Sequence, residues 1–304
     1  MTRLISAPIL LTAALAALLC FTVMASAVSS LYSAVFGEHG IPVQTGLAYG
    51  PGPRQTLDVY APPDGVDEKN AIILFLYGGS WSSGDRATYA FAGQALATRG
   101  FTTVIPDYRL YPEVQFPAFI DDLAAAYAWT AKTLAQRCTS ARPIIVAGHS
   151  AGGHMAALLA LDRSFIARHG AGIAPPAALI GLAGPYTFEP TTWPSTRAAF
   201  ASVAATPDIP RPITYMAKGA PPALLLHGLA DDLVNLKNTR ELAAALKAAG
   251  TPVETAEYPG IGHIGLVLSL SRPFRWRAPA LDRMVEFASR FDMPAAAKAT
   301  CAAR

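Results

Sequence analysis

The chain has 304 residues, a length that fits one α/β domain and an N-terminal segment. Its formal net charge is only +3 and it contains no basic block or basic stripe interleaved with aromatic residues, which argues against nucleic acid as a partner. Hydrophobic residues make up 52% of the sequence, a high share that the first 36 residues inflate.

The N-terminal segment, residues 1–36, is almost entirely apolar. No charged residue occurs from Leu4 to Val28, a run longer than the core of about 7–15 residues of a signal peptide and long enough to cross a bilayer. Ala25-Ser26-Ala27 has the small residues of a cleavage site, whereas the apolar character continues to Phe36, as in an uncleaved anchor. The segment is therefore either a signal peptide or a membrane anchor. An anchor would associate with the membrane through residues 4–28. Both predict an exported domain that is periplasmic, secreted or membrane-anchored.

Residues 37–54 are rich in glycine and proline and are predicted to be a linker to a catalytic domain at 55–293, which an Ala-rich tail, 294–304, follows. Within the domain, strand-like and helix-like segments alternate, which predicts a mostly parallel central sheet covered by helices. The predicted strands are 55–60, 71–76, 101–106, 144–147, 177–183, 222–227 and 253–258, and helical spacing recurs at 116–134, 151–161, 242–249 and 281–287.

A Gly-rich loop, Tyr77-Gly78-Gly79-Ser80-Trp81, follows the apolar strand at 71–76. Glycines in such a loop let the backbone approach a substrate carbonyl and present N–H groups to it. The alternative is a plain turn, but the motif at residues 148–152 favours a loop that presents N–H groups to a substrate.

The most informative motif is Gly148-His149-Ser150-Ala151-Gly152, which has the pattern G-x-S-x-G. A strand rich in β-branched residues precedes it, and a helix rich in small residues follows at once. This context is typical of a nucleophile elbow, a tight turn that exposes the serine hydroxyl beside the first N–H groups of a helix. Ser150 is therefore predicted to be a nucleophile.

Residues 184–222, between two predicted strands, carry many prolines and aromatic residues. Folds of this kind insert elements over the active site at this point, so the segment is predicted to be a cap or substrate region. Its aromatic residues would line an acyl or alcohol pocket, or would pack at the surface without touching substrate; they are Tyr186, Phe188, Trp193, Phe200 and Tyr215.

A nucleophilic serine needs a base and an orienting carboxylate, and in such folds the chain order is serine, acid, histidine. Asp231 and Asp232 follow the predicted strand at 222–227. Asp231 is predicted to be the acid because it comes first after the strand, and Asp232 is the alternative. His263, in a Gly-rich loop after the strand at 253–258, is predicted to be the base.

The other histidines are predicted to be packed side chains (His227, His154), the variable residue of the elbow (His149) and surface residues (His39, His169). No two of them have convincing metal-ligand spacing, so neither a metal nor another cofactor is expected.

Together these motifs resemble the α/β-hydrolase esterases of the hormone-sensitive-lipase and feruloyl-esterase-like branch, which also holds kynurenine formamidase and isoprenylcysteine methylesterase. The resemblance covers about residues 55–290, and it also rests on Leu57-Asp58-Val59-Tyr60 and Asp107-Tyr108-Arg109-Leu110. It implies the α/β-hydrolase fold and, as oxyanion donors, the backbone N–H groups of Gly79, Ser80 and Ala151.

One residue departs from the pattern of this branch, which usually has His-Gly-Gly where this chain has Tyr77-Gly78-Gly79. The histidine of the branch braces the loop. A tyrosine hydroxyl can brace it too, because it both donates and accepts hydrogen bonds. The departure therefore concerns loop geometry and substrate shape more than hydrolysis itself.

The sequence thus predicts a serine esterase that cleaves small to medium carboxylic esters through an acyl-enzyme, with a small-molecule ester as its partner. An amide or formamide hydrolase with the same triad is one alternative, and a membrane-tethered binding protein without turnover is another. The sequence specifies no oligomeric state.

Two cysteines near the periphery of the domain, Cys138 and Cys301, are predicted to form a disulfide in an oxidising compartment, since Cys20 belongs to the N-terminal segment. The alternative is two unpaired surface thiols.

Overall fold

A computed structural model describes residues 35–135, 141–215 and 219–292. The predicted Cys138–Cys301 disulfide, the tail 294–304 and all but the last two residues of the N-terminal segment lie outside these ranges and stay predictions. Within the described ranges, no helix is both long and apolar enough to span a bilayer.

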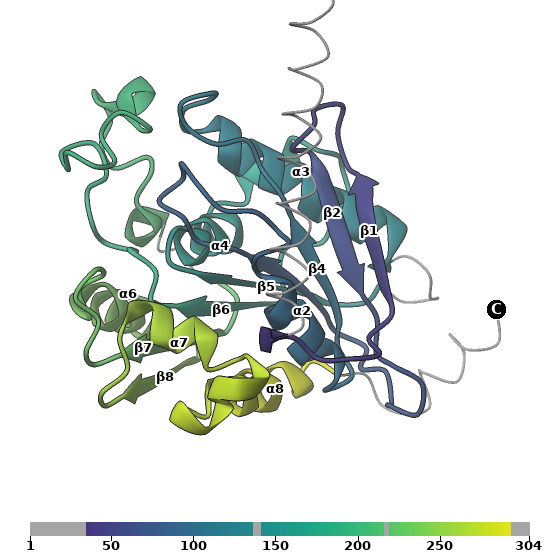
Figure 1. Cartoon of the computed structure of the whole chain (residues 1–304). Coiled ribbons are helices and arrows are strands. Elements are labelled where there is room, and N and C mark those ends of the chain that lie inside the picture. The colour runs from purple at the N-terminus through teal and green to yellow at the C-terminus, as the bar shows by residue number, and fades with distance from the viewer. Residues whose placement is uncertain (1–34, 136–140, 216–218, 293–304) are drawn as a thin grey trace, which may run out of the picture.

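An eight-stranded sheet runs through the centre of the molecule in the order β1-β2-β4-β3-β5-β6-β7-β8 (Figure 1). Its strands are β1 (Val43–Ala48), β2 (Thr56–Tyr60), β3 (Ile72–Leu76), β4 (Thr102–Pro106), β5 (Ile144–His149), β6 (Ala178–Leu182), β7 (Ala223–Gly228) and β8 (Val253–Tyr258). The pairs β1–β2 and β2–β4 are antiparallel, and the other pairs are parallel. The predicted α/β fold with a mostly parallel sheet is confirmed.

Strand β1 lies inside residues 37–54, for which the sequence predicted a linker. It is an edge strand whose side chains are nearly all exposed, so it lacks the apolar alternation that signals a strand. Its register shifts between Gln44 and Leu47, around Gly46, whose N–H donates to Asp58 Oδ1 at 2.8 Å. This bulge lets an irregular sequence still pair with β2.

Helices cover both faces of the sheet. They are α2 (Ala90–Ala97), α3 (Ala118–Thr133), α4 (Ala151–Leu161), α5 (Ser164–Ala167), α6 (Lys237–Ala248), α7 (His263–Leu268) and α8 (Ala280–Ser289), with short 3₁₀ helices η2 (Ala201–Val203), η3 (Pro212–Tyr215) and η4 (Arg272–Arg277). The crossover through α2 leads from β3 toward the β1 edge, whereas the crossover through α4 leads from β5 toward the β8 edge. Because such crossovers are right-handed, α2 and α4 lie on opposite faces.

The strand order reverses direction between β3 and β5, which are neighbours in the sheet. Their register pairs Leu76 with Gly148, so both strands end at the same level. The loops that leave these ends lead to opposite faces and open a crevice between them. The Gly-rich loop and Ser150 therefore lie side by side at this crevice.

Candidate active site

Ser150 forms the turn between β5 and α4. Its backbone angles, φ 57° and ψ −124°, are seldom adopted by a residue other than glycine and store strain. A Cβ atom on Gly148 would lie 2.3 Å from the Gly152 carbonyl oxygen, and one on Gly152 would lie 2.1 Å from the Leu76 carbonyl oxygen. Side chains are therefore impossible at both glycines, and the tight elbow predicted from the motif forms here.

The Gly-rich loop after β3 has three successive residues with positive φ, namely Gly79 (135°), Ser80 (52°) and Trp81 (58°). The Gly79 carbonyl accepts hydrogen bonds from the N–H groups of Ser82 and Ser83, both at 3.0 Å. Because the N–H and C=O of a trans peptide point in opposite directions, the N–H of Ser80 faces away from this turn. It is therefore free to meet a ligand.

Asp231 and His263 form a hydrogen bond, with Asp231 Oδ2 at 2.7 Å from His263 Nδ1. The other carboxylate oxygen, Oδ1, accepts the backbone N–H groups of Leu233 (3.0 Å) and Val234 (2.8 Å). Burial by itself would raise the pKa of Asp231, but the hydrogen bonds from His263 and from these two N–H groups lower it below its ordinary value. The carboxylate is therefore ionised and fixes the imidazole ring.

His263 is the first residue of α7, whereas the sequence predicted it in a Gly-rich loop. Since an ionised carboxylate can only accept, Nδ1 carries the proton and Nε2 has a free lone pair. Nε2 is buried and has no hydrogen-bond partner in the described part of the chain, so no hydrogen bond joins it to Ser150. In structures without substrate this bond is often long. The tautomer of His263 is the one that a general base requires.

His149, the residue before Ser150, brings His263 to the elbow. The two imidazole rings have centroids 4.7 Å apart, and His149 Nε2 lies 3.2 Å from the backbone carbonyl oxygen of His263. His149 Nδ1 lies 3.1 Å from the hydroxyl of Tyr89. Burial and the neighbouring His263 lower the pKa of His149 to about 3, so the ring is neutral. Sequence reasoning treated His149 as a variable residue and missed this contact.

The alternative acid, Asp232, is exposed, and its carboxylate forms no hydrogen bond or ion pair with any described residue. Among the other histidines, His227 is buried and its ring nitrogens contact Thr239 Oγ1 (2.7 Å) and Val234 O (2.9 Å), which confirms that it is a packed side chain. The ring of His154 is also buried, with Nε2 at 2.6 Å from Pro210 O. Within the described ranges, no three His, Cys, Asp or Glu residues group in a way that could hold a metal ion.

A cavity of about 240 Å³ opens beside the elbow, and Ser80, Ser150 and Ala151 are among the residues that line it. Gly79, the third oxyanion donor expected from the resemblance, does not line it. The predicted cap segment, residues 184–222, contributes Phe188 and Trp193, and the Gly-rich loop contributes Trp81. We call these three aromatic side chains the roof of the cavity. The remaining lining residues are Pro185, Ser195, Thr196, Leu233, Val234, Asn235 and Asn238. The other cap aromatics predicted for the pocket do not line it, since Tyr186 and Phe200 are fully buried in the core and Tyr215 binds Ile209 O.

Asn238, on α6, holds the roof of this cavity in position. Its Oδ1 accepts the backbone N–H groups of Thr187 (3.0 Å) and Phe188 (3.1 Å), and its Nδ2 donates to Asn235 O (3.0 Å). Phe188 in turn faces Trp81 in a nearly parallel arrangement, with ring centroids 6.3 Å apart. One buried amide thus fixes the cap segment to the helix that follows the Asp231 loop.

The fold and site agree with comparisons to known proteins. Residues 118–288 match the model of the prolyl oligopeptidase family. The chain belongs to this family. A further model, BD-FAE, matches residues 57–169. Together with the relatives below, these matches confirm the resemblance to α/β-hydrolases of the esterase type.

Among the curated relatives, Esterase LipC of Mycobacterium tuberculosis is 31% identical over 236 residues, which cover 71% of this chain and 58% of LipC. The isoprenylcysteine alpha-carbonyl methylesterase ICME of Arabidopsis thaliana is 25% identical over 84% of this chain and 64% of its own length. The chain thus spans less than two thirds of each of these relatives. The crystal structure of Esterase B from Lactobacillus rhamnosis, at 21% identity, superposes with a TM-score of 0.69 and covers 92% of this chain and 96% of that one, which supports the fold.

In this member of the family, Tyr77 braces the Gly-rich loop through its hydroxyl and its ring. Its hydroxyl donates to Asp107 Oδ1 (3.0 Å) and accepts from Arg54 Nη2 (2.9 Å). Its ring stacks on Tyr108 at 4.6 Å, and the Tyr108 hydroxyl donates to the Tyr77 carbonyl at 3.1 Å. Arg54 also donates to the Gly84 carbonyl at 2.8 Å. The start of the loop at Tyr77 and the segment that follows it at Gly84 are therefore tied to one polar cluster.

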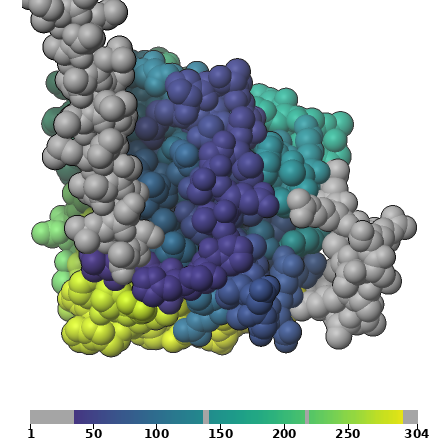
Figure 2. Space-filling model, turned by 45° about the vertical axis from the view of Figure 1, so that its right-hand side comes forward, coloured from purple at the N-terminus to yellow at the C-terminus, as the bar shows by residue number. Residues whose placement is uncertain are grey.

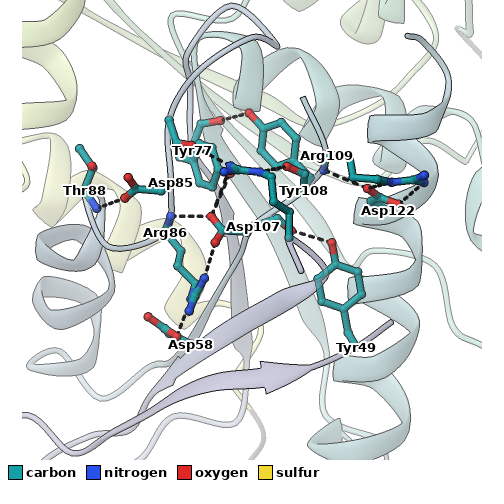
Figure 3. Close-up of polar contacts among 12 residues, drawn as sticks. Tyr49, Asp58, Tyr77, Asp85, Arg86, Thr88, Asp107, Tyr108, Arg109 and Asp122 are labelled. Atoms are coloured by element: carbon teal, nitrogen blue, oxygen red, sulfur yellow. Dashed lines mark hydrogen bonds and ion pairs between the residues drawn. The ribbon is translucent and has the colours of Figure 1, made fainter. Parts of the chain in front are cut away.

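The cluster extends from the loop into the sheet, as Figure 3 shows for Tyr77, Asp107, Arg86 and Asp58. Asp107 accepts the backbone N–H of Arg86 at 2.8 Å and pairs with the Arg86 guanidinium, whose Nε donates to Asp58 Oδ1 at 2.7 Å. Arg109, two residues after Asp107, forms a two-point ion pair with Asp122 on α3. The Asp-Tyr-Arg motif therefore connects the Gly-rich loop to β2 and to α3.

Proposed function

We propose that this protein is a serine hydrolase that cleaves carboxylic esters of small to medium size. The observation that carries the proposal is the Asp231–His263 hydrogen bond, which leaves a basic Nε2 beside the strained Ser150 elbow. The esterase names of LipC and ICME support the same reaction class.

In the proposed reaction, Ser150 Oγ attacks the ester carbonyl while His263 Nε2 takes its proton. The N–H groups of Ser80 and Ala151, with that of Gly79 as a further expected donor, stabilise the oxyanion of the tetrahedral intermediate. Asp231 stabilises the imidazolium, which then protonates the departing alcohol. Water, activated by the same imidazole, releases the acid from the acyl-enzyme.

The size and lining of the cavity support small to medium substrates. Its volume of about 240 Å³ is smaller than the roughly 300–1,000 Å³ of common ligand sites. Phe188 and Trp193 make one wall apolar, whereas Ser195, Thr196 and Asn235 add polar groups. A short acyl or alcohol group fits such a space better than a long chain or a folded peptide.

The decisive experiment compares wild type, Ser150→Ala, His263→Ala and the double variant on a series of nitrophenyl esters. Since the members of a triad act as one unit, each single variant should lower kcat by about 10⁵–10⁶, and the double variant should add little. A fluorophosphonate should label wild type at Ser150 and leave Ser150→Ala unlabelled. Near wild-type turnover in either single variant contradicts the assignment, provided that circular dichroism shows an unchanged fold.

A matched ester and anilide separate the two hydrolase classes. Faster turnover of the ester supports the esterase, and faster turnover of the anilide supports an amide hydrolase. If neither is cleaved and the fluorophosphonate does not react, the chain is a binding protein on a hydrolase scaffold.

A further inference from the structure

The 3₁₀ helix η4 carries the sequence Arg-Pro-Phe-Arg-Trp-Arg on the surface of the domain. Trp276 has 82% of its side chain exposed, more than any other large hydrophobic residue in the described ranges. Its indole Nε1 donates to Pro273 O at 3.1 Å, so the ring is held against its own helix while its faces stay in water. Arg272 and Arg277 are exposed on the same short helix. We call Arg272, Trp276 and Arg277 the Arg-Trp patch.

The patch carries positive charge that no ion pair with a described acid offsets. The third arginine of η4, Arg275, pairs with Glu38 and donates to Leu270 O at 3.2 Å, so its charge is compensated. Neither Arg272 nor Arg277 has an acidic partner among the described residues, and the sequence contains no Asp or Glu in the stretches outside them. An exposed indole on the same short helix as two guanidinium groups without an acidic partner suits the boundary between lipid headgroups and acyl chains.

The patch also lies where the chain enters the domain. Phe36 contacts Phe274 of η4 with ring centroids 5.9 Å apart, and Glu38 pairs with Arg275. Figure 2 shows the first described residues, in dark purple, directly against the yellow surface of the C-terminal elements. The patch is therefore adjacent to the end of the apolar N-terminal segment.

Chain length limits how far the patch can lie from a bilayer that holds this segment. No charged residue occurs between Arg3 and Glu38, and the stretch from Leu4 to Val28 is long enough to cross a membrane. From Val28 to Phe36 a fully extended chain reaches about 28 Å. With the segment retained as an anchor, η4 is thus held close to the headgroups.

We propose that the Arg-Trp patch docks on the surface of an anionic phospholipid bilayer and holds the domain against the membrane beside its N-terminal segment. Trp276 enters the interface, and Arg272 and Arg277 pair with lipid phosphates. The contact is separate from the proposed hydrolysis, because the patch contains no residue of the cavity or of the Asp231–His263 pair.

The test uses the full-length chain in vesicles of phosphatidylglycerol and phosphatidylcholine whose acyl chains are brominated, which quench nearby tryptophan fluorescence. The chain has four tryptophans, and Trp193, 57% exposed on the cap, is the matched control for Trp276. We expect quenching in wild type and in Trp193→Phe, and its loss in Trp276→Phe. Quenching that survives in Trp276→Phe, or that disappears in Trp193→Phe, overturns the proposal.

The charges are tested with Arg272→Gln and Arg277→Gln in the same vesicles. Each should shift half-maximal quenching to about five-fold more phosphatidylglycerol, because one arginine near an anionic surface contributes about that factor. An unchanged lipid dependence contradicts the proposed phosphate contacts. If the patch instead binds a second copy of the chain, Trp276→Phe will abolish a dimer seen by light scattering in detergent, which also refutes lipid docking. Turnover of a soluble ester should be unchanged in Trp276→Phe, Arg272→Gln and Arg277→Gln, so failure here is distinct from failure of the proposed hydrolysis.

Discussion

At Asp231, one buried carboxylate receives hydrogen bonds from three donors, the Nδ1–H of His263 and the backbone N–H groups of Leu233 and Val234. The two backbone hydrogen bonds fix which oxygen faces the imidazole. They also stabilise the negative charge of the carboxylate, which would in turn stabilise an imidazolium at His263. The neighbouring Asp232 has the same side chain in the same loop and none of these partners, so the pair offers a matched comparison.

Asp231→Asn should lower kcat on the order of 10⁴, as in other triads, whereas Asp232→Asn should change it little. In Asp231→Asn the backbone N–H groups retain the amide oxygen and turn its NH₂ group toward His263. That donor forces the imidazole proton onto Nε2, where the base must be free. Steady-state kinetics on one nitrophenyl ester measure both variants, and a reversed ranking would give the role to Asp232.

Among the elements, the Gly-rich loop after β3 depends most on distant side chains. Tyr77 lies between Arg54 and Asp107, which come from the β1–β2 connection and from the end of β4. Positive φ at Gly79, Ser80 and Trp81 shows that the loop is not in a relaxed conformation, so it needs such external contacts to persist.

Tyr77→Phe should lower the free energy of unfolding by about 1–3 kcal/mol, because the buried Asp107 loses one of its donors. It should also lower kcat by about ten-fold with little change in KM, because the N–H groups that meet the oxyanion shift. Tyr49→Phe is the control, since its hydroxyl donates to the backbone carbonyl of Asp107 at 2.6 Å and does not touch the loop. If both variants lose stability and neither loses kcat, Tyr77 is structural only.

The strands of the sheet were largely predictable from the sequence, whereas several helices, one edge strand and the long-range contacts were not. The strands from β2 to β8 begin within one residue of their predicted ranges. For β3, β5, β6 and β7 the reason is that buried parallel strands are nearly continuous apolar runs. Helices α2 and α7 and strand β1 were not predicted, since α2 is apolar without a clear stripe, α7 is very short and β1 is exposed. The contacts of Arg54 and Asn238 join residues 23 and 51 positions apart, and no local spacing signals them.

For the whole molecule, buried neutral histidines make stability depend on pH. Burial lowers the pKa of His154 to about 4, against about 6.5 in an unfolded chain. As pH falls, the unfolded chain therefore binds a proton before the folded protein does. The stability that His154 contributes is present above about pH 6.5 and is lost progressively toward pH 4.

Denaturant titrations at pH 7 and pH 5 should show that wild type loses about 2 kcal/mol more than His154→Gln over this interval. The comparison uses the pH dependence, so a lower absolute stability of His154→Gln does not affect it. His39→Gln, at an exposed position, should lose as much as wild type. If wild type and His154→Gln lose equal stability between pH 7 and pH 5, His154 takes up its proton as readily in the folded protein as in the unfolded chain.

Strand β8 lies at the edge of the sheet and has the least buried side chains of the parallel strands, yet it leads directly into His263. The serine comes from β5 in the fully buried centre, and Asp231 from the neighbour of β8. Edge segments open at lower free energy than buried ones. Gentle heating should therefore separate His263 from Ser150 while most of the core is still folded, so that the lifetime of the proposed hydrolase activity is set by the outermost parallel strand.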